Sequence, residues 1–206
     1  MLSTPDIIDG YPELKVLAKF KHFGGKKIFH GEVQTVKCFE DNSYVKKELS
    51  NPSESGVLIV DGEGSENCAL LGDLLAQMGK DNGWSGIVIN GFVRDIEILR
   101  GIEIGVMALG SCPRKSDKKN LGQKNLGINI NDTAIKPGNW CYADENGILI
   151  SETKLEISSS TRNLISQLIW QIRQIKSKNG CRNQSQHMKW CRWEEINYCI
   201  AIWFVF

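Results

Sequence analysis

The chain has 206 residues, of which 41 % are hydrophobic and 24 % are charged, as expected for one globular domain with a substantial core. Its formal net charge of +1 argues against a general nucleic-acid binder, because such proteins carry a strong basic excess. The longest apolar stretch, YCIAIWFVF at the end of the sequence, is too short to span a bilayer. We therefore expect no nucleic-acid partner and no membrane partner.

Cysteine usage and the first residues predict a cytoplasmic protein. Seven cysteines are an odd number and no two of them form a CxxC pair, which favours reduced thiols over a disulfide framework. The opening MLSTPDIIDGYPELK has Asp and Pro where the apolar part of a signal peptide would lie. We expect Cys38, Cys68, Cys112 and Cys141 to be small core residues.

Strands and helices are predicted to alternate along the first three quarters of the chain. Residues 28–39 alternate apolar and polar side chains, as a half-buried strand does. Short apolar runs, typical of fully buried strands, occur at 55–62, at 85–91 and within 101–113. Between the first two runs, the pattern of residues 65–83 predicts a helix that is broken in its middle. The chain is therefore predicted to have an α/β fold.

The sequence changes character twice towards its end. Residues 113–125 are basic and contain glycine, which is typical of a solvated surface loop. After 157 a linker-like SSSTRN is followed by the amphipathic pattern of a helix at 164–176. From 158 onward the chain carries seven basic and two acidic residues. We predict a domain over 1–157 and an atypical extension over 158–206, interpreted as a terminal helix with a poorly ordered end rather than as a partner-binding segment.

Three charged residues are placed where a ligand site is expected. Arg94 and Asp95 directly follow an apolar strand, and ligands of open α/β sheets gather at such strand ends. Asp73 follows a glycine and precedes LLAQMG, which makes it a candidate helix N-cap. The free N–H groups of Leu74, Leu75 and Ala76 would then bind a carboxylate. Such a crevice offers a guanidinium and amides to an anion and two carboxylates to a hard divalent cation.

Spacing alone leaves a structural explanation open. Exposed Arg and Asp are common, so Asp73 could simply cap a helix while Arg94 and Asp95 form a surface pair. From the spacing, this explanation is at least as well supported as the functional one.

Four stretches closely resemble the RraA-like family, which holds the regulators of ribonuclease E activity and the class II 4-hydroxy-4-methyl-2-oxoglutarate aldolases. They are FGGKKIFHGEVQTVKCFEDN (23–42), GVLIVDGEGSENCALLGDLLAQMGKDNGWSGIVINGFVRDIEIL (56–99), IGVMALGSCPRKSDKKNLG (104–122) and GNWCYADENGILIS (138–151). The resemblance covers nearly all of residues 5–157 and none of the extension. It implies the swivelling β/β/α fold of the family, assembled as a homotrimer or a dimer of trimers with sites at subunit interfaces.

One motif separates the two functions of the family. In its aldolase members an Asp, twenty residues, and then Arg-Asp bind metal and substrate, and this sequence has all three residues, as Asp73, Arg94 and Asp95. By this resemblance Asp95 is the metal ligand, and Arg94 contacts the carboxylate or keto oxygen of the substrate. Asp73 holds a water of the metal, and the backbone from Gly72 through Leu74 to Leu75 forms the carboxylate cradle. Some aldolases add an acidic residue from a neighbouring subunit, which cannot be aligned here.

The resemblance implies a divalent-metal-dependent aldolase that uses Mg²⁺ or Mn²⁺. It would cleave a small 2-oxo acid of the 4-hydroxy-4-methyl-2-oxoglutarate type to pyruvate, and oxaloacetate would lose CO₂ in the same site because it yields the same enolate. The alternative is a non-enzymatic regulator that binds and inhibits a ribonuclease. Regulator members tend to lack the acidic pair, so the intact motif favours the enzyme.

Overall fold

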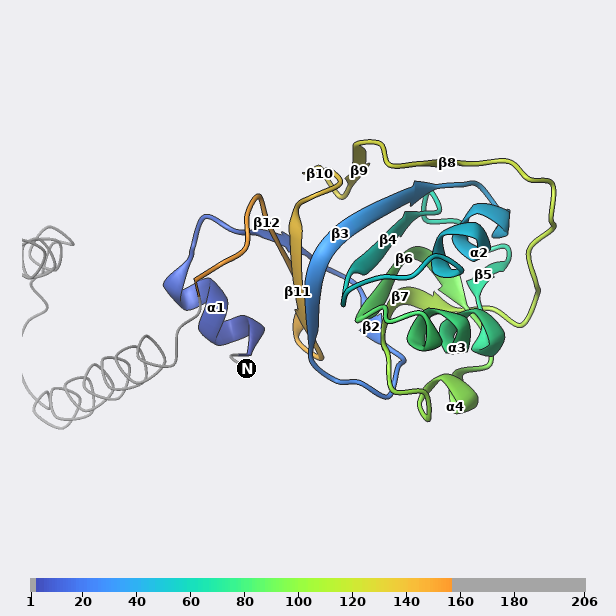
Figure 1. The fold of residues 1–206 in the computed structure, drawn as a ribbon, viewed down its shortest axis with the longest axis horizontal. Helices are drawn as coiled ribbons and strands as arrows, with labels where there is room; N and C mark the ends of the chain where they lie inside the picture. Colours follow the sequence, from blue (N-terminus) through green and yellow to red (C-terminus); the bar gives the residue numbers. More distant parts are fainter. Residues whose placement is uncertain (1–2, 157–206) are drawn as a thin grey trace, which may run out of the picture. The chain divides into compact units, whose positions relative to one another are not determined.

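A computed structural model of the protein describes residues 3–156. Within them the chain forms four helices, a curled ten-stranded sheet and a separate two-stranded hairpin (Figure 1). The helices are α1 (Thr4–Gly10), α2 (Ser43–Leu49), α3 (Asp73–Asp81) and α4 (Ile96–Leu99). The strands are β1 (Lys15–Leu17), β2 (Lys21–His22), β3 (Phe29–Lys37), β4 (Val57–Asp61), β5 (Ala69–Leu71), β6 (Gly86–Val93), β7 (Gly105–Ser111), β8 (Gln123–Lys124), β9 (Ile128–Ile130), β10 (Thr133–Ile135), β11 (Trp140–Asp144) and β12 (Gly147–Ser151).

The predicted α/β class is confirmed, and the centre of the sheet is parallel. Strand β4 pairs in parallel with β3 on one side and with β6 on the other, and β7 extends this set beyond β6. All five residues of β4 are buried, because Leu58 and Val60 face one core while Val57 and Ile59 face another. A strand covered on both faces reads as a continuous apolar run, which is why the sequence pattern identified it.

Strand β3 joins the parallel part of the sheet to an antiparallel part. Its first residues, Phe29–Glu32, pair antiparallel with β11, whereas Val33–Lys37 pair with β4. Beyond β11 the sheet continues through β12 to β1, also antiparallel. The sheet curls around this long strand (Figure 1).

Two core layers lie on opposite faces of the sheet. On one face, Val45 and Leu49 of α2 and Ala76 of α3 pack against the strands. On the other face, the β9–β10 hairpin and strands β11 and β12 enclose the second layer. The Phe29 ring lies in this layer against Gly86 and Gly105, where an added Cβ would collide with it. These two glycines therefore let the ring lie directly on the sheet backbone.

The prediction of a helix over 65–83 is correct for its second half only. In its first half, Ala69–Leu71 form the short strand β5, which pairs in parallel with β6. Helix α3 begins only at Asp73. A three-residue buried run cannot be assigned by periodicity, because it fits a helix turn as well as a strand. The pairing with β6 decides it, and that contact is tertiary.

The basic segment 113–125 is mainly an exposed loop, as predicted, and ends in β8, which pairs with β3. Within residues 3–156 no helix has the length and apolar character needed to cross a membrane. The predicted linker, the predicted helix at 164–176 and the Trp- and Cys-rich end lie outside the described residues. The division into 1–157 and 158–206 therefore stays a prediction.

Candidate functional site

Arg94 and Asp95 lie at the carboxyl end of β6, where the sequence placed them. The backbone N–H of Arg94 donates to the carbonyl of Leu71 at 3.0 Å, which ties the end of β6 to the end of β5. Asp95 has the left-handed conformation (φ 57°, ψ 42°), and its carbonyl accepts the N–H groups of Ile98 and Leu99 at 3.0 Å. Left-handed backbone is uncommon outside glycine, although Asp tolerates it better than most residues, and such positions cluster at functional sites.

The two side chains form an ion pair. Arg94 Nε donates to Asp95 Oδ2 at 2.9 Å, and the side chains keep 36 % and 27 % of their surface exposed. The second carboxylate oxygen of Asp95 has no hydrogen-bond donor among the described residues. The pair is thus half-buried, and it leaves one anionic oxygen and part of the guanidinium available to a ligand.

The start of α3 differs by one residue from the prediction. Gly72 is the N-cap and Asp73 is the first helical residue, so the expected capping by Asp73 is wrong. Its Oδ1 instead accepts the N–H of the next residue, Leu74, at 2.7 Å. The N–H of Ala76 donates to the carbonyl of Gly72 at 3.1 Å and is not free either. Among the three amides expected to be open, only that of Leu75 has no acceptor in the described residues.

Gly72 lies directly against the ion pair. A Cβ on Gly72 would come within 2.8 Å of Asp95 Oδ2 and 3.1 Å of Arg94 Cγ. Its φ of −136° is ordinary for any residue, so space rather than backbone conformation requires glycine here. The start of α3 and the end of β6 are therefore in close contact, and the structure brings Asp73, Arg94 and Asp95 to one place.

These residues share a cleft of about 350 Å³. Gly72, Asp73, Leu74, Leu75, Arg94 and Asp95 line it, so every predicted site residue is present. The cleft is also lined by residues outside the predicted site: Asn42, Lys46, Ala69, Leu71, Met78, Lys115, Ser116 and Lys118. The three lysines belong to α2 and to the loop read as plain solvated surface. For Lys115 and Lys118, the only signal in the sequence was the basic composition of the loop. Composition alone does not say where a loop lies relative to Arg94.

The donor set fits a hard divalent cation that keeps most of its water. Within residues 3–156 no group of three or more His, Cys, Asp or Glu side chains comes together as a metal cage. A cation in this cleft would be held by Asp95, with Asp73 as the second carboxylate of the lining. Mg²⁺ is typically bound in this way, through one or two carboxylates and several waters.

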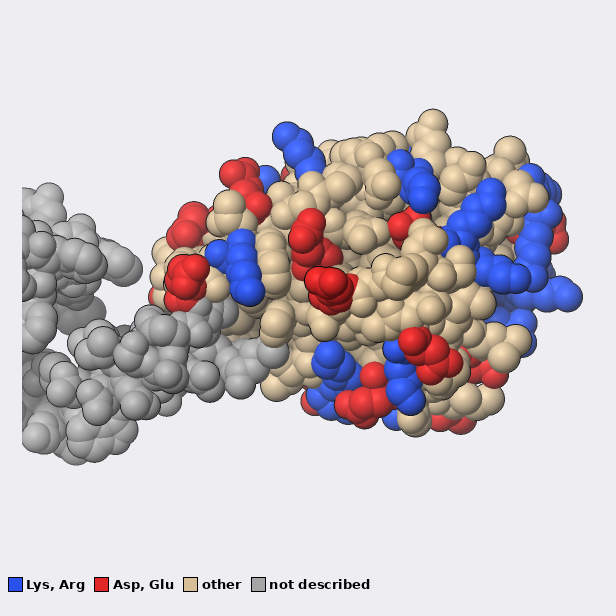
Figure 2. Space-filling model, in the orientation of Figure 1, with Lys and Arg blue, Asp and Glu red and all other residues tan. Residues whose placement is uncertain are grey.

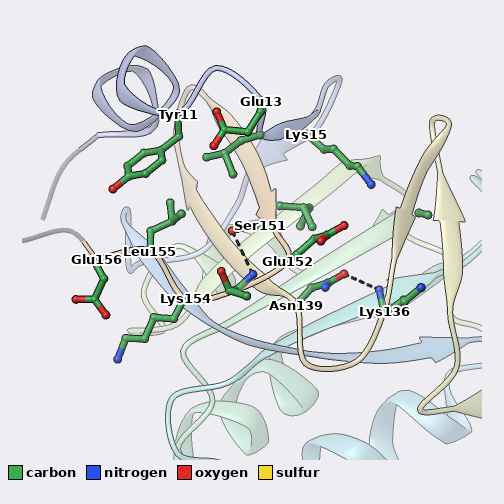
Figure 3. Close-up of a pocket in the computed structure, with 14 residues that line it drawn as sticks. Tyr11, Glu13, Lys15, Lys136, Asn139, Ser151, Glu152, Lys154, Leu155 and Glu156 are labelled. Atoms are coloured by element: carbon green, nitrogen blue, oxygen red, sulfur yellow. Dashed lines mark hydrogen bonds between the residues drawn. The ribbon is translucent and has the colours of Figure 1, made fainter. Parts of the chain in front are cut away.

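A larger hollow lies elsewhere. It has a volume of about 950 Å³ and is lined mainly by residues from the segment between α1 and β1, from β12 and from the segment up to Glu156 (Figure 3). Its charged side chains are balanced, with three glutamates and three lysines: Glu13, Glu152, Glu156, Lys15, Lys136 and Lys154. None of the predicted site residues lines it. With no charge excess and no cluster of metal ligands, it has less to offer a metal or a 2-oxo acid than the smaller cleft.

Cysteines and histidines of the described residues give no competing site. Cys38, Cys68 and Cys141 are buried as predicted, whereas Cys112 is only partly buried. Burial raises the pKa of the Cys38 thiol to about 12, with neighbouring carboxylates acting in the same direction, so this thiol stays protonated. The pKa values of His22 and His30 are lowered, mainly by burial. Neither histidine lines the cleft.

The fold and the cleft define an α/β protein of the RraA type. A family model described as RraA-like, Aldolase/RraA, matches residues 4–150, and the chain belongs to this family. A protein of Shewanella oneidensis named "Putative 4-hydroxy-4-methyl-2-oxoglutarate aldolase" is 52 % identical over 156 residues, which are 75 % of this chain and 95 % of that protein.

Two solved structures support the same fold at 39 % identity. The RNA-processing inhibitor RraA from Thermus thermophilis has a TM-score of 0.74 and matches 77 % of this chain and 98 % of its own. A protein described as S-adenosylmethionine:2-dimethylmenaquinone methyltransferase, from Geobacillus kaustophilus, has a TM-score of 0.72. The match covers 75 % of this chain and 97 % of that protein. The predicted fold is thus confirmed. Because these relatives carry three different functional names, the family by itself does not decide the activity, and the site must.

Proposed function

We propose that the protein is a divalent-metal-dependent aldolase that cleaves 4-hydroxy-4-methyl-2-oxoglutarate-type 2-oxo acids to pyruvate and also decarboxylates oxaloacetate. The observation that carries the proposal is the Arg94–Asp95 ion pair at the end of β6, packed against Gly72 and sharing a cleft with Asp73. The aldolase name of a relative with 52 % identity supports it.

Asp95, with Asp73 as the neighbouring carboxylate, would hold Mg²⁺ or Mn²⁺. The cation, when bound, supplies Lewis acidity at the 2-oxo and carboxylate oxygens of the substrate. The substrate carboxylate would lie at the start of α3, where the amide of Leu75 is open and the helix dipole favours an anion. To use the amide of Leu74 as well, the substrate would displace Asp73 Oδ1 from it. The cradle from Gly72 to Leu75 therefore stays a prediction.

The cleavage involves no net oxidation or reduction. Asp73 orients the water that removes the proton from the 4-hydroxyl group, and the bond between C3 and C4 then breaks. Its electron pair moves into a C2–C3 double bond, and negative charge develops on the C2 oxygen while C4 becomes a carbonyl. The guanidinium of Arg94 stabilises that oxygen in the transition state. A proton delivered to C3 completes pyruvate.

The proposal is tested by pyruvate release coupled to lactate dehydrogenase. The substrates are 4-hydroxy-4-methyl-2-oxoglutarate and oxaloacetate, each with Mg²⁺, with Mn²⁺ and with EDTA. We expect release with either metal and none with EDTA. No release from either substrate, by folded protein with metal present, would contradict the proposal.

Replacing Gly72 with Ala is expected to lower kcat/KM roughly 10- to 100-fold, because the new methyl group displaces Asp95 and Arg94 and misplacements of about 1 Å are costly in active sites. The free energy of unfolding should change by less than about 1 kcal/mol, since the backbone conformation suits Ala. The coupled assay and urea denaturation measure the two quantities. Gly127→Ala is the matched control, because its nearest neighbours are 3.9 Å away. Wild-type kcat/KM in Gly72→Ala would show that Gly72 does not position the pair.

A second candidate function is regulation of a ribonuclease by direct binding. The observation that favours it is the similarity to the RNA-processing inhibitor RraA from Thermus thermophilis. Affinity capture with purified ribonuclease, run beside the lyase assay, separates the two. Capture without pyruvate release would support the regulator.

We further propose that the chain forms a homotrimer or a dimer of trimers with its sites at subunit interfaces. Two exposed apolar side chains support this: Leu74, which lines the cleft, is 78 % exposed, and Ile98 of α4 is 55 % exposed. Large exposed apolar side chains are candidates for contacts between subunits. Light scattering coupled to size-exclusion chromatography tests the assembly, and a monomeric mass would contradict it.

A further inference from the structure

The cleft has a second, cationic wall that the proposed chemistry does not use. Lys46 comes from α2, and Lys115 and Lys118 come from the loop that follows β7. None of these three ammonium groups forms an ion pair within the part of the chain that the structure describes. Figure 2 shows Lys and Arg side chains gathered at the end of the molecule where this loop passes α2. Three unpaired cations in one cleft favour an anionic ligand.

Two buried polar atoms at this wall also lack partners. The side-chain Oδ1 of Asn42 and the Oγ of Ser116 are buried without a hydrogen bond, and both residues line the cleft. Ser116 is only 6 % exposed. An unsatisfied buried polar group costs free energy, and native proteins usually leave one only where water or a ligand can reach it. The wall therefore contains two polar atoms whose hydrogen-bonding capacity is unused among the described residues: a hydroxyl that can donate and an amide oxygen that can only accept.

Asp41 anchors the loop that carries two of the lysines. Its Oδ2 accepts the backbone N–H groups of Lys119 at 2.8 Å and Leu121 at 3.0 Å. Its Oδ1 accepts the N–H of Ser43 at 2.8 Å, at the start of α2. Asp41 is 1 % exposed, and it thus fastens the loop to the helix that carries Lys46.

The charge of Asp41 is maintained over a wide pH range. Burial by itself would raise its pKa, but hydrogen bonds from the side chain and backbone of Ser43 and from the backbone of Leu121 and Lys119 outweigh burial and lower the pKa to about 2. The anchor is therefore ionised at every pH at which the protein would be assayed.

We propose that Asp41 is a positioning residue that holds Lys115 and Lys118, beside Lys46, as a subsite for the second carboxylate of a dicarboxylic 2-oxo acid. The inference rests on the proposed function, and it explains why the cleft carries more cations than one carboxylate needs. A substrate whose first carboxylate and 2-oxo group lie at Asp95, Arg94 and α3 would present its other end to these lysines. The wall then selects dicarboxylic over monocarboxylic substrates.

The first experiment compares two substrates that differ in one group. One is 4-hydroxy-4-methyl-2-oxoglutarate, and the other is 4-hydroxy-4-methyl-2-oxopentanoate, in which a methyl group replaces the second carboxylate. Both break the same bond and release pyruvate, the second with acetone in place of the second pyruvate. We expect the dicarboxylate to have a kcat/KM roughly 10- to 100-fold higher, the worth of a charge-assisted hydrogen bond. Equal values overturn the inference while leaving the proposed function intact, whereas no pyruvate from either overturns both.

The second experiment removes the lysines. The double variant Lys115→Met/Lys118→Met is expected to raise KM for the dicarboxylate roughly 10- to 100-fold and to leave kcat/KM for the monocarboxylate unchanged. Lys119→Met is the matched control, because this lysine lies on the same loop but pairs with Asp117 at 3.6 Å and does not line the cleft. Equal losses on both substrates, or no loss on either, overturn the inference.

The third experiment tests the anchor. Asp41→Asn should accelerate hydrogen exchange of the Lys119 and Leu121 amides and raise KM for the dicarboxylate with kcat nearly unchanged. A merely structural role of Asp41 would reduce turnover of both substrates alike, and that result overturns the positioning role. Should Asp41→Asn fail to fold, the lysine variants still decide whether the wall binds the second carboxylate.

Discussion

Replacing Asp95 with Asn is expected to reduce metal-dependent pyruvate release by a factor on the order of 10³, because Lewis-acid stabilisation of developing charge is worth several kcal/mol and needs an anionic ligand for the cation. Asn is the informative replacement. It tolerates the left-handed backbone of position 95, and its amide oxygen can still accept from Arg94 Nε. The substitution therefore removes the charge and keeps the local structure.

Two measurements assign such a loss to the metal. Calorimetric titration with Mn²⁺ should show that the metal binds much more weakly to Asp95→Asn than to the wild type. Urea denaturation should give the two proteins a similar free energy of unfolding. Glu103→Gln serves as the control, because it removes an exposed carboxylate just after α4, outside the cleft. Wild-type turnover by Asp95→Asn would rule out Asp95 as the metal ligand.

Arg94→Met is expected to lower kcat by roughly 10²- to 10³-fold, the usual loss when one donor that stabilises a developing oxyanion is removed. Arg94→Lys should recover only part of it. A lysine keeps the charge, but its ammonium is a compact point charge that cannot bind Asp95 through Nε and present further N–H groups to the substrate at the same time. The order expected for kcat is therefore wild type, then Lys, then Met.

The coupled assay at saturating Mg²⁺ gives kcat and KM separately for these variants. Arg100→Met is the control, since Arg100 is exposed at the end of α4 and does not line the cleft. If Arg94→Met changed KM alone, Arg94 would bind the substrate without stabilising the transition state, and its proposed catalytic role would be wrong.

The sequence predicted the buried strands and the end of β6 well, because these features are local. A run such as VLIVD is apolar at every position only when both faces are covered, and β4 is buried throughout. The position of Arg94 and Asp95 followed from a second such run, which forms β6 and ends directly before them. Spacing could not separate a metal and substrate site from an exposed ion pair, and the family resemblance favoured the former, which stays a prediction.

The errors occurred where tertiary contacts decide the local structure. Residues 69–71 form β5 because they pair with β6, and a three-residue run carries no periodicity from which to predict this. Asp73 was predicted to be the N-cap, but Gly72 occupies that position, and Asp95 and Arg94 leave no space for a side chain on it. In both cases the deciding neighbour is about twenty residues away in the chain.

By itself, the sequence determined the α/β class, the charged residues of the site and their order along the chain, because apolar patterning and residue identity are encoded locally. Only the tertiary structure decided which other residues share the cleft. Asp41 bonds to amides 78 and 80 residues away, and this contact brings a loop read as plain surface to the wall of the cleft. A buried carboxylate helps to place that loop, together with the bridge between Ala69 and Lys115, and no pattern in the sequence marks such long-range hydrogen bonds in advance.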